Sequence, residues 1–186
     1  MIQGERSSDN LKNEGVSKAK ILTFSDVKEY NYKGENTIRP EGERIYKNGK
    51  VSTRERTEVF VNLNKRYKNS RPQQYDVILA LKSSAYCPRL IFFEDENSKM
   101  DMIYSNDVVF LRAINNEKID PRFIFFIMNS TKIKEYLNVE SEKNNPKRIS
   151  CSMIEKIKID LPPVEKQREI VENMIQNEIN IDNLIG

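Results

Sequence analysis

The sequence predicts an α+β fold: a β-rich part with mixed or antiparallel strands and short helices, followed by a C-terminal α-helix. Short runs of β-branched and aromatic residues recur up to about residue 112, which is typical of strands. Beyond Asp120 the apolar residues change to helical spacing. The length of 186 residues fits one domain, or one domain with a short appendage, and is too short for a TIM barrel.

The first expected strand covers residues 20–24, after a polar stretch without apolar periodicity. Residues 43–47 and 50–54 flank Asn48-Gly49, the strongest short hairpin signal, because both turn positions need positive φ. Four further strands, each bounded by Pro, Asn or Asp, are expected at residues 57–63, 75–81, 89–93 and 108–112.

Helices are expected in the last third of the chain. Asp120-Pro121 is typical of an N-cap followed by Pro at the first helical position. Ser130-Thr131 is expected to cap a second helix that runs to Leu137. Ser152 and Glu155 form a capping-box pattern for a short helix, followed by an expected strand at residues 157–161.

The last helix is expected to start after Pro162-Pro163 and to extend for about 22 residues. Its apolar stripe, the candidate helix interface, consists of Ile170, Val171, Met174, Ile175, Ile181 and Leu184. Such a stripe packs either on its own domain or against a partner helix, and the sequence leaves both alternatives open. We therefore divide the chain into a flexible N-terminal arm (1–18), a main domain (19–161) and a C-terminal helix (162–186).

Composition excludes several classes of protein. A mean hydropathy of −0.69 and 32% charged residues indicate a globular protein with a hydrated surface, and no apolar run approaches the ~18 residues of a membrane span. The absence of histidine excludes Ser-His and Cys-His catalytic groups and imidazole zinc sites. Cys87 and Cys151 are far apart, and with no signal peptide we expect a cytoplasmic protein with unbridged thiols.

Basic charge is concentrated between Glu41 and Gln74. This segment holds nine basic and four acidic residues, a local net charge of +5 against +3 for the whole chain. Lys and Arg neutralise phosphates, while Asn, Gln and Arg pair with base edges, so the mixture suits DNA. A solvated surface is the alternative, and composition alone favours it. The candidates are Arg44, Lys47, Lys50, Arg54, Arg56, Lys65, Arg66, Tyr67, Lys68, Arg71, Gln73 and Gln74.

Two other segments are candidates for DNA contact, each with an ordinary surface turn as the alternative. They contribute Lys82 and Ser83 after a strand, and Lys143, Asn144, Asn145, Lys147 and Arg148 in a polar loop. In contrast, Phe123, Phe125 and Phe126 lie at helical spacing, which favours core packing over base stacking.

Three sequence motifs resemble the DNA-specificity subunits of Type I restriction-modification systems. Residues 157–171 (IKIDLPPVEKQREIV) are similar to the family's I-x-I-x-L-P-P strand and the E-x-Q-x-x-I-V start of its spacer helix. Residues 76–84 (DVILALKSS) resemble its D-I-L-x-S-x-x-G strand and turn, without the turn glycine, and residues 122–130 (RFIFFIMNS) its Y-L-Y-Y-L-L-x-S helix. Together the motifs cover roughly residues 75–175.

The resemblance implies a target recognition domain that reads one half of a bipartite site in double-stranded DNA. It implies docking to DNA adenine methyltransferase subunits and to a restriction (motor) subunit, and a homodimer or a second half-subunit paired through the C-terminal helix. The family usually has two such domains, so this chain is expected to act as a half-subunit. S-adenosylmethionine, ATP and Mg²⁺ are expected only in the partner subunits, with no cofactor and no metal in this chain.

Two other functions stay open. Asp26-Val27-Lys28 is an acid-x-Lys tripeptide of the kind found in metal-dependent nucleases, although no partner acid is evident. The chain also fits a protein-interaction domain without a DNA role. Because it lacks a G-x-G-x-x-G and a Walker loop, we expect a non-catalytic DNA-recognition module.

Overall fold

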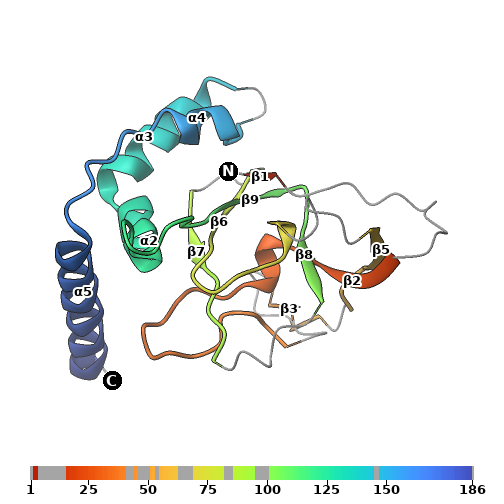
Figure 1. The fold of residues 1–186 in the computed structure, drawn as a ribbon, viewed down its shortest axis with the longest axis horizontal. Helices are drawn as coiled ribbons and strands as arrows, with labels where there is room; N and C mark the ends of the chain where they lie inside the picture. Colours follow the sequence, from red (N-terminus) through yellow and green to blue (C-terminus); the bar gives the residue numbers. More distant parts are fainter. Residues whose placement is uncertain are drawn as a thin grey trace.

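A computed structural model gives the fold and confirms the α+β class. It describes residues 2–3, 16–40, 44–45, 51–52, 55–62, 69–81, 86–94, 101–144 and 147–185. The β-rich part lies to one side of the α-helices, with the C-terminal helix outermost (Figure 1).

The strands in the described part of the chain form three sheets. The sheet orders are β1-β9-β6-β7, β5-β2-β8 and β3-β4. Only β2 and β8 pair in parallel among the described strands, so the predicted mixed or antiparallel arrangement is confirmed. The strands are β1 (Ile2–Gln3), β2 (Val16–Leu22), β3 (Arg44–Ile45), β4 (Val51–Ser52), β5 (Glu58–Asn62), β6 (Val77–Ala80), β7 (Arg89–Leu90), β8 (Met102–Tyr104) and β9 (Val108–Leu111).

The predicted hairpin is present: Arg44 pairs with Ser52 and Ile45 with Val51, while the Asn48-Gly49 turn lies outside the described residues. The predicted N-terminal arm contains strand residues, since β1 pairs with β9 and β2 already begins at Val16. The strand expected at residues 20–24 is thus β2, which begins four residues earlier and ends at Leu22, since the polar Ser17 and Lys18 in its first half weaken the apolar signal.

Strand β8 was not predicted. Its three residues are buried, and the run is shorter than the four-residue minimum on which a strand pattern rests. The signal was a buried Met-Ile-Tyr run between Asp101 and the Asn106-Asp107 turn.

Helix α2 (Pro121–Asn129) begins as predicted: Oδ1 of Asp120 accepts the backbone N–H of Arg122 at 2.9 Å, and Pro121 is the first helical residue. The phenylalanines of α2 are 4–6% exposed and belong to the main core cluster, which confirms core packing. Helix α3 (Thr131–Glu142) follows directly, with Ser130 as its N-cap, and extends five residues past the predicted end.

Helix α4 (Cys151–Glu155) has Ser150 at its N-cap position and already contains Ser152, so the predicted Ser152–Glu155 capping box is wrong. The predicted strand at residues 157–161 is also wrong. This segment carries no strand, and Ile159 and Leu161 are 37% and 51% exposed, so its alternating residues do not face a sheet.

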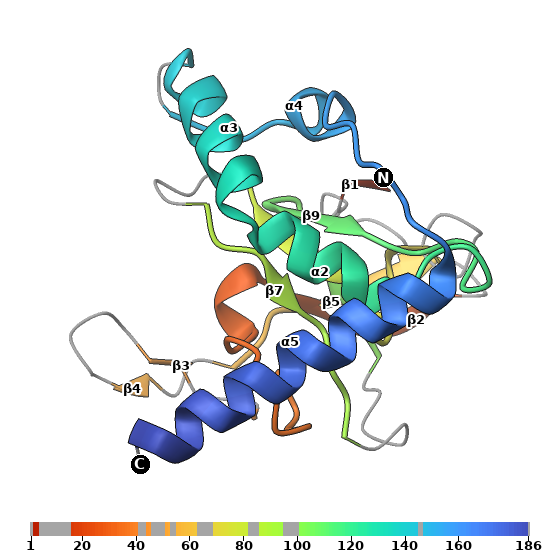
Figure 2. The same ribbon diagram turned by 90° about the vertical axis from the view of Figure 1, so that its left-hand side faces the viewer.

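Helix α5 (Val164–Ile185) has 22 residues and follows the two prolines, as predicted. It lies across α2, on the side away from the sheets, so that α2 is sandwiched between α5 and β7 (Figure 2). Among the described residues, no helix is long and apolar enough to cross a membrane. Cys87 and Cys151 are free thiols of intermediate exposure.

Candidate nucleic-acid interface

Much of the predicted basic surface falls outside the described residues. For Arg44 the structure describes the backbone alone. The candidates outside the described part are Lys47, Lys50, Arg54, Lys65, Arg66, Tyr67, Lys68, Lys82, Ser83 and Asn145.

Arg56 does not fit its predicted role in DNA contact. Arg56 is only 6% exposed. Its Nη2 donates to the backbone oxygen of Arg39 at 2.5 Å, and its Nε lies 3.9 Å from Oδ1 of Asp26. A guanidinium that is buried against a carboxylate is used within the fold, and contact with phosphate would require it to leave that partner.

Asp26, the residue on which the nuclease hypothesis depends, is 2% exposed. Its Oδ2 accepts the backbone N–H of Thr23 at 2.8 Å and the Thr23 hydroxyl at 2.5 Å. The Asp26 carboxylate thus caps a short 3-10 turn, and Arg56 lies beside its Oδ1. Because both carboxylate oxygens are occupied and buried, the structure argues against a metal-dependent nuclease site at Asp26.

The segment 69–74 lies at the end of the basic region and directly precedes the turn into β6. Gln74 does not fit the prediction, because its Nε2 donates to the Phe93 oxygen at 3.2 Å and its Oε1 accepts the Phe93 N–H at 2.7 Å. Gln73 is exposed, and Arg71 forms an ion pair at 3.0 Å with the exposed Asp101. Asn69, which was not among the candidates, is exposed as well.

A buried charge pair fastens this segment to the main sheet. Nε and Nη2 of Arg112 donate to the two carboxylate oxygens of Asp76, each at 2.7 Å. Asp76 is 1% exposed and also accepts the Tyr104 hydroxyl at 2.7 Å and the Gln73 N–H at 2.9 Å. Burial, with the adjacent Asp76 carboxylate, raises the pKa of Tyr104 well above its ordinary value, so the phenol stays a donor.

Sequence reasoning missed this pair, although a signal was present. The β6–β9 register pairs Val77 with Leu111, so Asp76 and Arg112, one residue beyond each strand, become cross-strand neighbours. Opposite charges that flank two apolar strands were therefore the pattern to find.

The second predicted loop carries its own counter-charges. Lys143 pairs with Glu140, and Lys147 pairs with Glu142 at 3.2 Å. The amide of Asn144 donates to the backbone oxygen of Arg148 at 3.0 Å, and Arg148 itself is exposed. The described part of this loop is thus an exposed turn with neutralised lysines, which favours the alternative of an ordinary surface turn.

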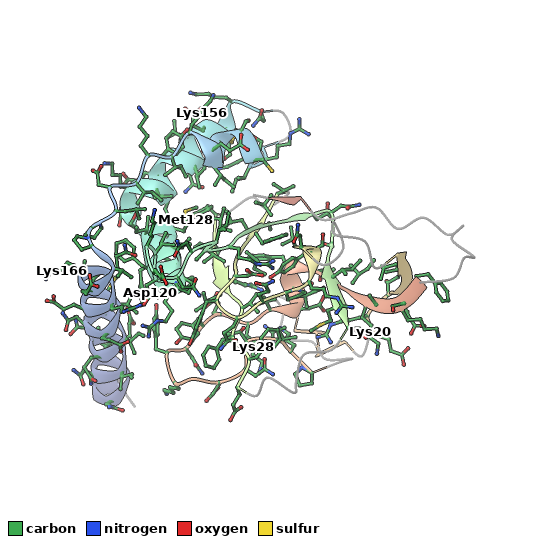
Figure 3. The ribbon with its side chains drawn as sticks, viewed as in Figure 1. Lys20, Lys28, Asp120, Met128, Lys156 and Lys166 are labelled. Carbon is green, nitrogen blue, oxygen red and sulfur yellow. The ribbon has the colours of Figure 1, made fainter. Side chains whose placement is uncertain are left out.

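The start of α5 is fixed to the domain by Gln167, which is 0% exposed. Its Oε1 accepts the Asp120 N–H at 3.0 Å, while its Nε2 donates to the oxygens of Lys118 at 3.0 Å and Pro162 at 2.7 Å. Figure 3 labels Asp120 at the end of α2 that faces α5.

The apolar stripe of α5 divides into two parts. Val171 is fully buried, and Ile170 and Ile175 pack partly buried against the main core, so these residues bind their own domain. Met174 and Ile181 are 40% and 49% exposed. The side chain of Leu184 lies outside the described part.

The Asp120–Arg122 pair beside Gln167 predicts acid sensitivity. Burial raises the pKa of Asp120, but hydrogen bonds from the side chain and backbone of Arg122 outweigh it, so the pKa lies below its usual value. A lowered folded-state pKa stabilises the fold above the unfolded-state value of about 3.9, and this contribution is lost as the pH falls through the folded-state value. We expect Asp120→Asn, which retains the N-cap, to show a shallower loss of unfolding free energy than wild type between about pH 5 and about pH 2. Urea unfolding across this range measures it, and parallel curves would contradict the assignment.

Comparison with known families places these features in context. The model of the Type I restriction modification DNA specificity domain matches residues 10–183, nearly the whole chain, including β2 to β9 and almost all of α5. No curated protein matches the chain. The chain therefore belongs to the Type I restriction modification DNA specificity domain family.

Proposed function

We propose that this chain reads one half of a bipartite duplex DNA target and carries methyltransferase subunits to it, without catalysing a reaction itself. The match to the DNA specificity domain over residues 10–183 carries the proposal. The exposed Asn69 and Gln73 and the partly exposed Arg71 support it, since amide and guanidinium groups pair with base edges.

In this proposal the second half of α5 is the docking helix. Met174 and Ile181 are seven residues apart, so they lie on one face of the helix, and both are exposed while the neighbouring Val171 is buried. The occupant is a helix of a second copy or of another half-subunit, which would place two recognition domains on the two parts of the target.

The chemistry belongs to the partners. An adenine methyltransferase subunit binds S-adenosylmethionine, a restriction subunit uses ATP with Mg²⁺, and the complex works in the cytosol. In support, the one acid-x-Lys candidate of this chain, Asp26, is buried against Arg56.

Duplex binding by the chain reconstituted with its methyltransferase partner tests the proposal. We expect an affinity for its target that falls about 100-fold between about 50 mM and about 200 mM salt, because a handful of phosphate contacts release counterions. The target is identified beforehand by methylome sequencing of the source strain with and without the gene. A complex that binds all duplexes with equal affinity would contradict the proposal. Mg²⁺-dependent DNA cleavage that Asp26→Ala abolishes would instead favour the nuclease function.

The proposed pairing through α5 is tested on the same reconstituted samples. Met174→Asp combined with Ile181→Asp is expected to prevent pairing of the chains in sedimentation, while the unfolding free energy changes little, since both side chains are already exposed. The matched control is Asn173→Asp with Asn180→Asp, which adds the same two charges at exposed positions of the same helix. Unchanged pairing in the Met174/Ile181 variant would show that α5 is not the docking helix.

A further inference from the structure

Exposure alternates along the segment that precedes β6. Asn69, Arg71 and Gln73 face solvent to a large or moderate degree, while Ser70 and Pro72 between them are buried. The exposed side chains are an amide, a guanidinium and an amide, which are the groups that form paired hydrogen bonds with purine edges in the major groove. A short stretch of chain thus presents three groups that can read bases to the solvent.

Arg112 holds the backbone of these same residues. Its Nη1 donates to the oxygen of Asn69 at 3.1 Å and its Nη2 to the oxygen of Arg71 at 2.7 Å. Its guanidinium also lies 4.9 Å from the ring centre of Phe110 in β9. One side chain therefore connects two of the three exposed positions to the main sheet.

Asp76 fixes the Arg112 guanidinium and the backbone of Gln73, the third of the three exposed positions. Its carboxylate binds Arg112 through both oxygens and accepts the backbone N–H of Gln73, while the Gln73 oxygen accepts the Asp76 N–H at 3.1 Å. Tyr104, buried in β8, donates to the same carboxylate and stacks on Phe110 with ring centres 4.6 Å apart. The attachment thus reaches both the main sheet and the β5-β2-β8 sheet.

The chain between Gln73 and β6 adopts a conformation that needs such support. Tyr75 has a φ of 64°, in the left-handed region that residues with a side chain rarely adopt. Its backbone N–H donates to the Ile91 oxygen at 2.7 Å, and the Ile91 N–H donates to the Asp76 oxygen at 2.8 Å. Uncommon backbone geometry persists where surrounding contacts enforce it, and it clusters at functional segments.

The charge of Arg112 is already matched by Asp76, whereas Arg71 pairs with Asp101 at side-chain exposures of 40% and 63%. Exposed ion pairs are weak and exchange readily, so Arg71 can leave Asp101 for a base or a phosphate. Arg112, 19% exposed and bound to a fully buried carboxylate, is placed to orient and not to contact DNA.

We infer that Asp76 and Arg112 are positioning residues that hold Asn69, Arg71 and Gln73 in the arrangement that reads bases. This inference rests on the proposed function. It adds Asn69 to the reading residues and assigns the discrimination between sequences, more than the affinity for DNA, to the Asp76–Arg112 pair.

The test compares wild type and Arg112→Lys in the complex with the methyltransferase partner, on the target duplex and on a scrambled duplex of equal length. Lysine keeps the charge but cannot bind Asp76 and the two backbone oxygens together. We expect the ratio of target to scrambled affinity to fall about tenfold or more, with the scrambled affinity and its salt dependence unchanged.

Arg122→Lys is the matched control, because Arg122 makes the same kind of paired contact with the buried Asp120, at 3.2 Å and 2.9 Å, on α2. Its ratio is expected to equal that of wild type. Gln73→Ala alone should lower the ratio of target to scrambled affinity. In the double variant with Arg112→Lys the ratio should fall by less than the two single losses combined, because a Gln73 side chain that is already displaced contributes little to base recognition. A purely structural role predicts independent losses.

If Arg112→Lys fails to fold, Tyr104→Phe is used in its place, since it removes one hydrogen bond to Asp76 and keeps the ring packing. A wild-type ratio in a folded variant of either kind, or independent losses in the double variant, overturns the inference and leaves the proposed function standing. A wild-type complex that shows no preference for any duplex instead overturns the proposed function, and the inference with it.

Discussion

Replacing Gln167 with leucine is expected to lower the free energy of unfolding by about 3 kcal/mol, because one buried and two partly buried backbone groups lose their hydrogen-bond partner, at about 1–3 kcal/mol for a buried group and less for a partly buried one. These groups are the N–H of Asp120 and the oxygens of Lys118 and Pro162. Leucine has a similar volume, so the loss reports the hydrogen bonds and not a cavity. Urea unfolding gives the free energy, and hydrogen exchange should show α5 opening first.

Gln176→Leu is the control on the same helix. Gln176 is exposed, and its amide donates to Asn180 at 3.0 Å, one turn further along. A change at such a position is usually within about 0.5 kcal/mol. Equal losses in the two variants would show that Gln167 does not anchor α5.

Removing the Asp76 carboxylate is expected to cost about 3–5 kcal/mol, the usual range when one partner of a buried ion pair is deleted. Asp76→Ala leaves the Arg112 guanidinium and the fully buried Tyr104 hydroxyl without their shared acceptor. Small domains are stable by only about 5–15 kcal/mol, so this loss is a large fraction of the total. Urea unfolding at pH 7 measures it.

Asp101→Ala is the matched control, since it also removes a carboxylate from an arginine, but at the surface. An exposed pair contributes about 0–1 kcal/mol, so we expect little change. Comparable losses for Asp76→Ala and Asp101→Ala would mean that the buried pair contributes no more than a surface contact.

Features whose causes are local in sequence could be predicted. The start of α2 depends on Asp120 and Pro121 alone, and the start of α5 on Pro162 and Pro163, so both were located correctly. The β3–β4 hairpin depends on the Asn48-Gly49 turn between its two strands and was also found. Each of these signals lies within a few residues of the structure it determines.

Features that depend on residues far away in the sequence could not be predicted. Arg56 was assigned to the DNA surface because it lies in a basic segment, but its burial depends on Asp26, 30 residues earlier in the sequence. The role of Arg112 likewise depends on the pairing of β6 with β9. A residue's type and neighbours indicate what it can bind, and only the pairing of strands decides what it does bind.

The parallel pairing of β2 with β8 has a consequence for synthesis of the chain. Strand β2 is the central strand of its sheet, yet its neighbours begin at Glu58 and Met102. During translation, residues 16–22 must wait until Tyr104 has left the ribosome before both edges of β2 are covered. Contacts between distant parts of a sequence form slowly. The edge of β2 is therefore open to misassociation in the nascent protein until then, and Lys18 and Lys20 lie along this strand, where charge opposes strand-to-strand aggregation.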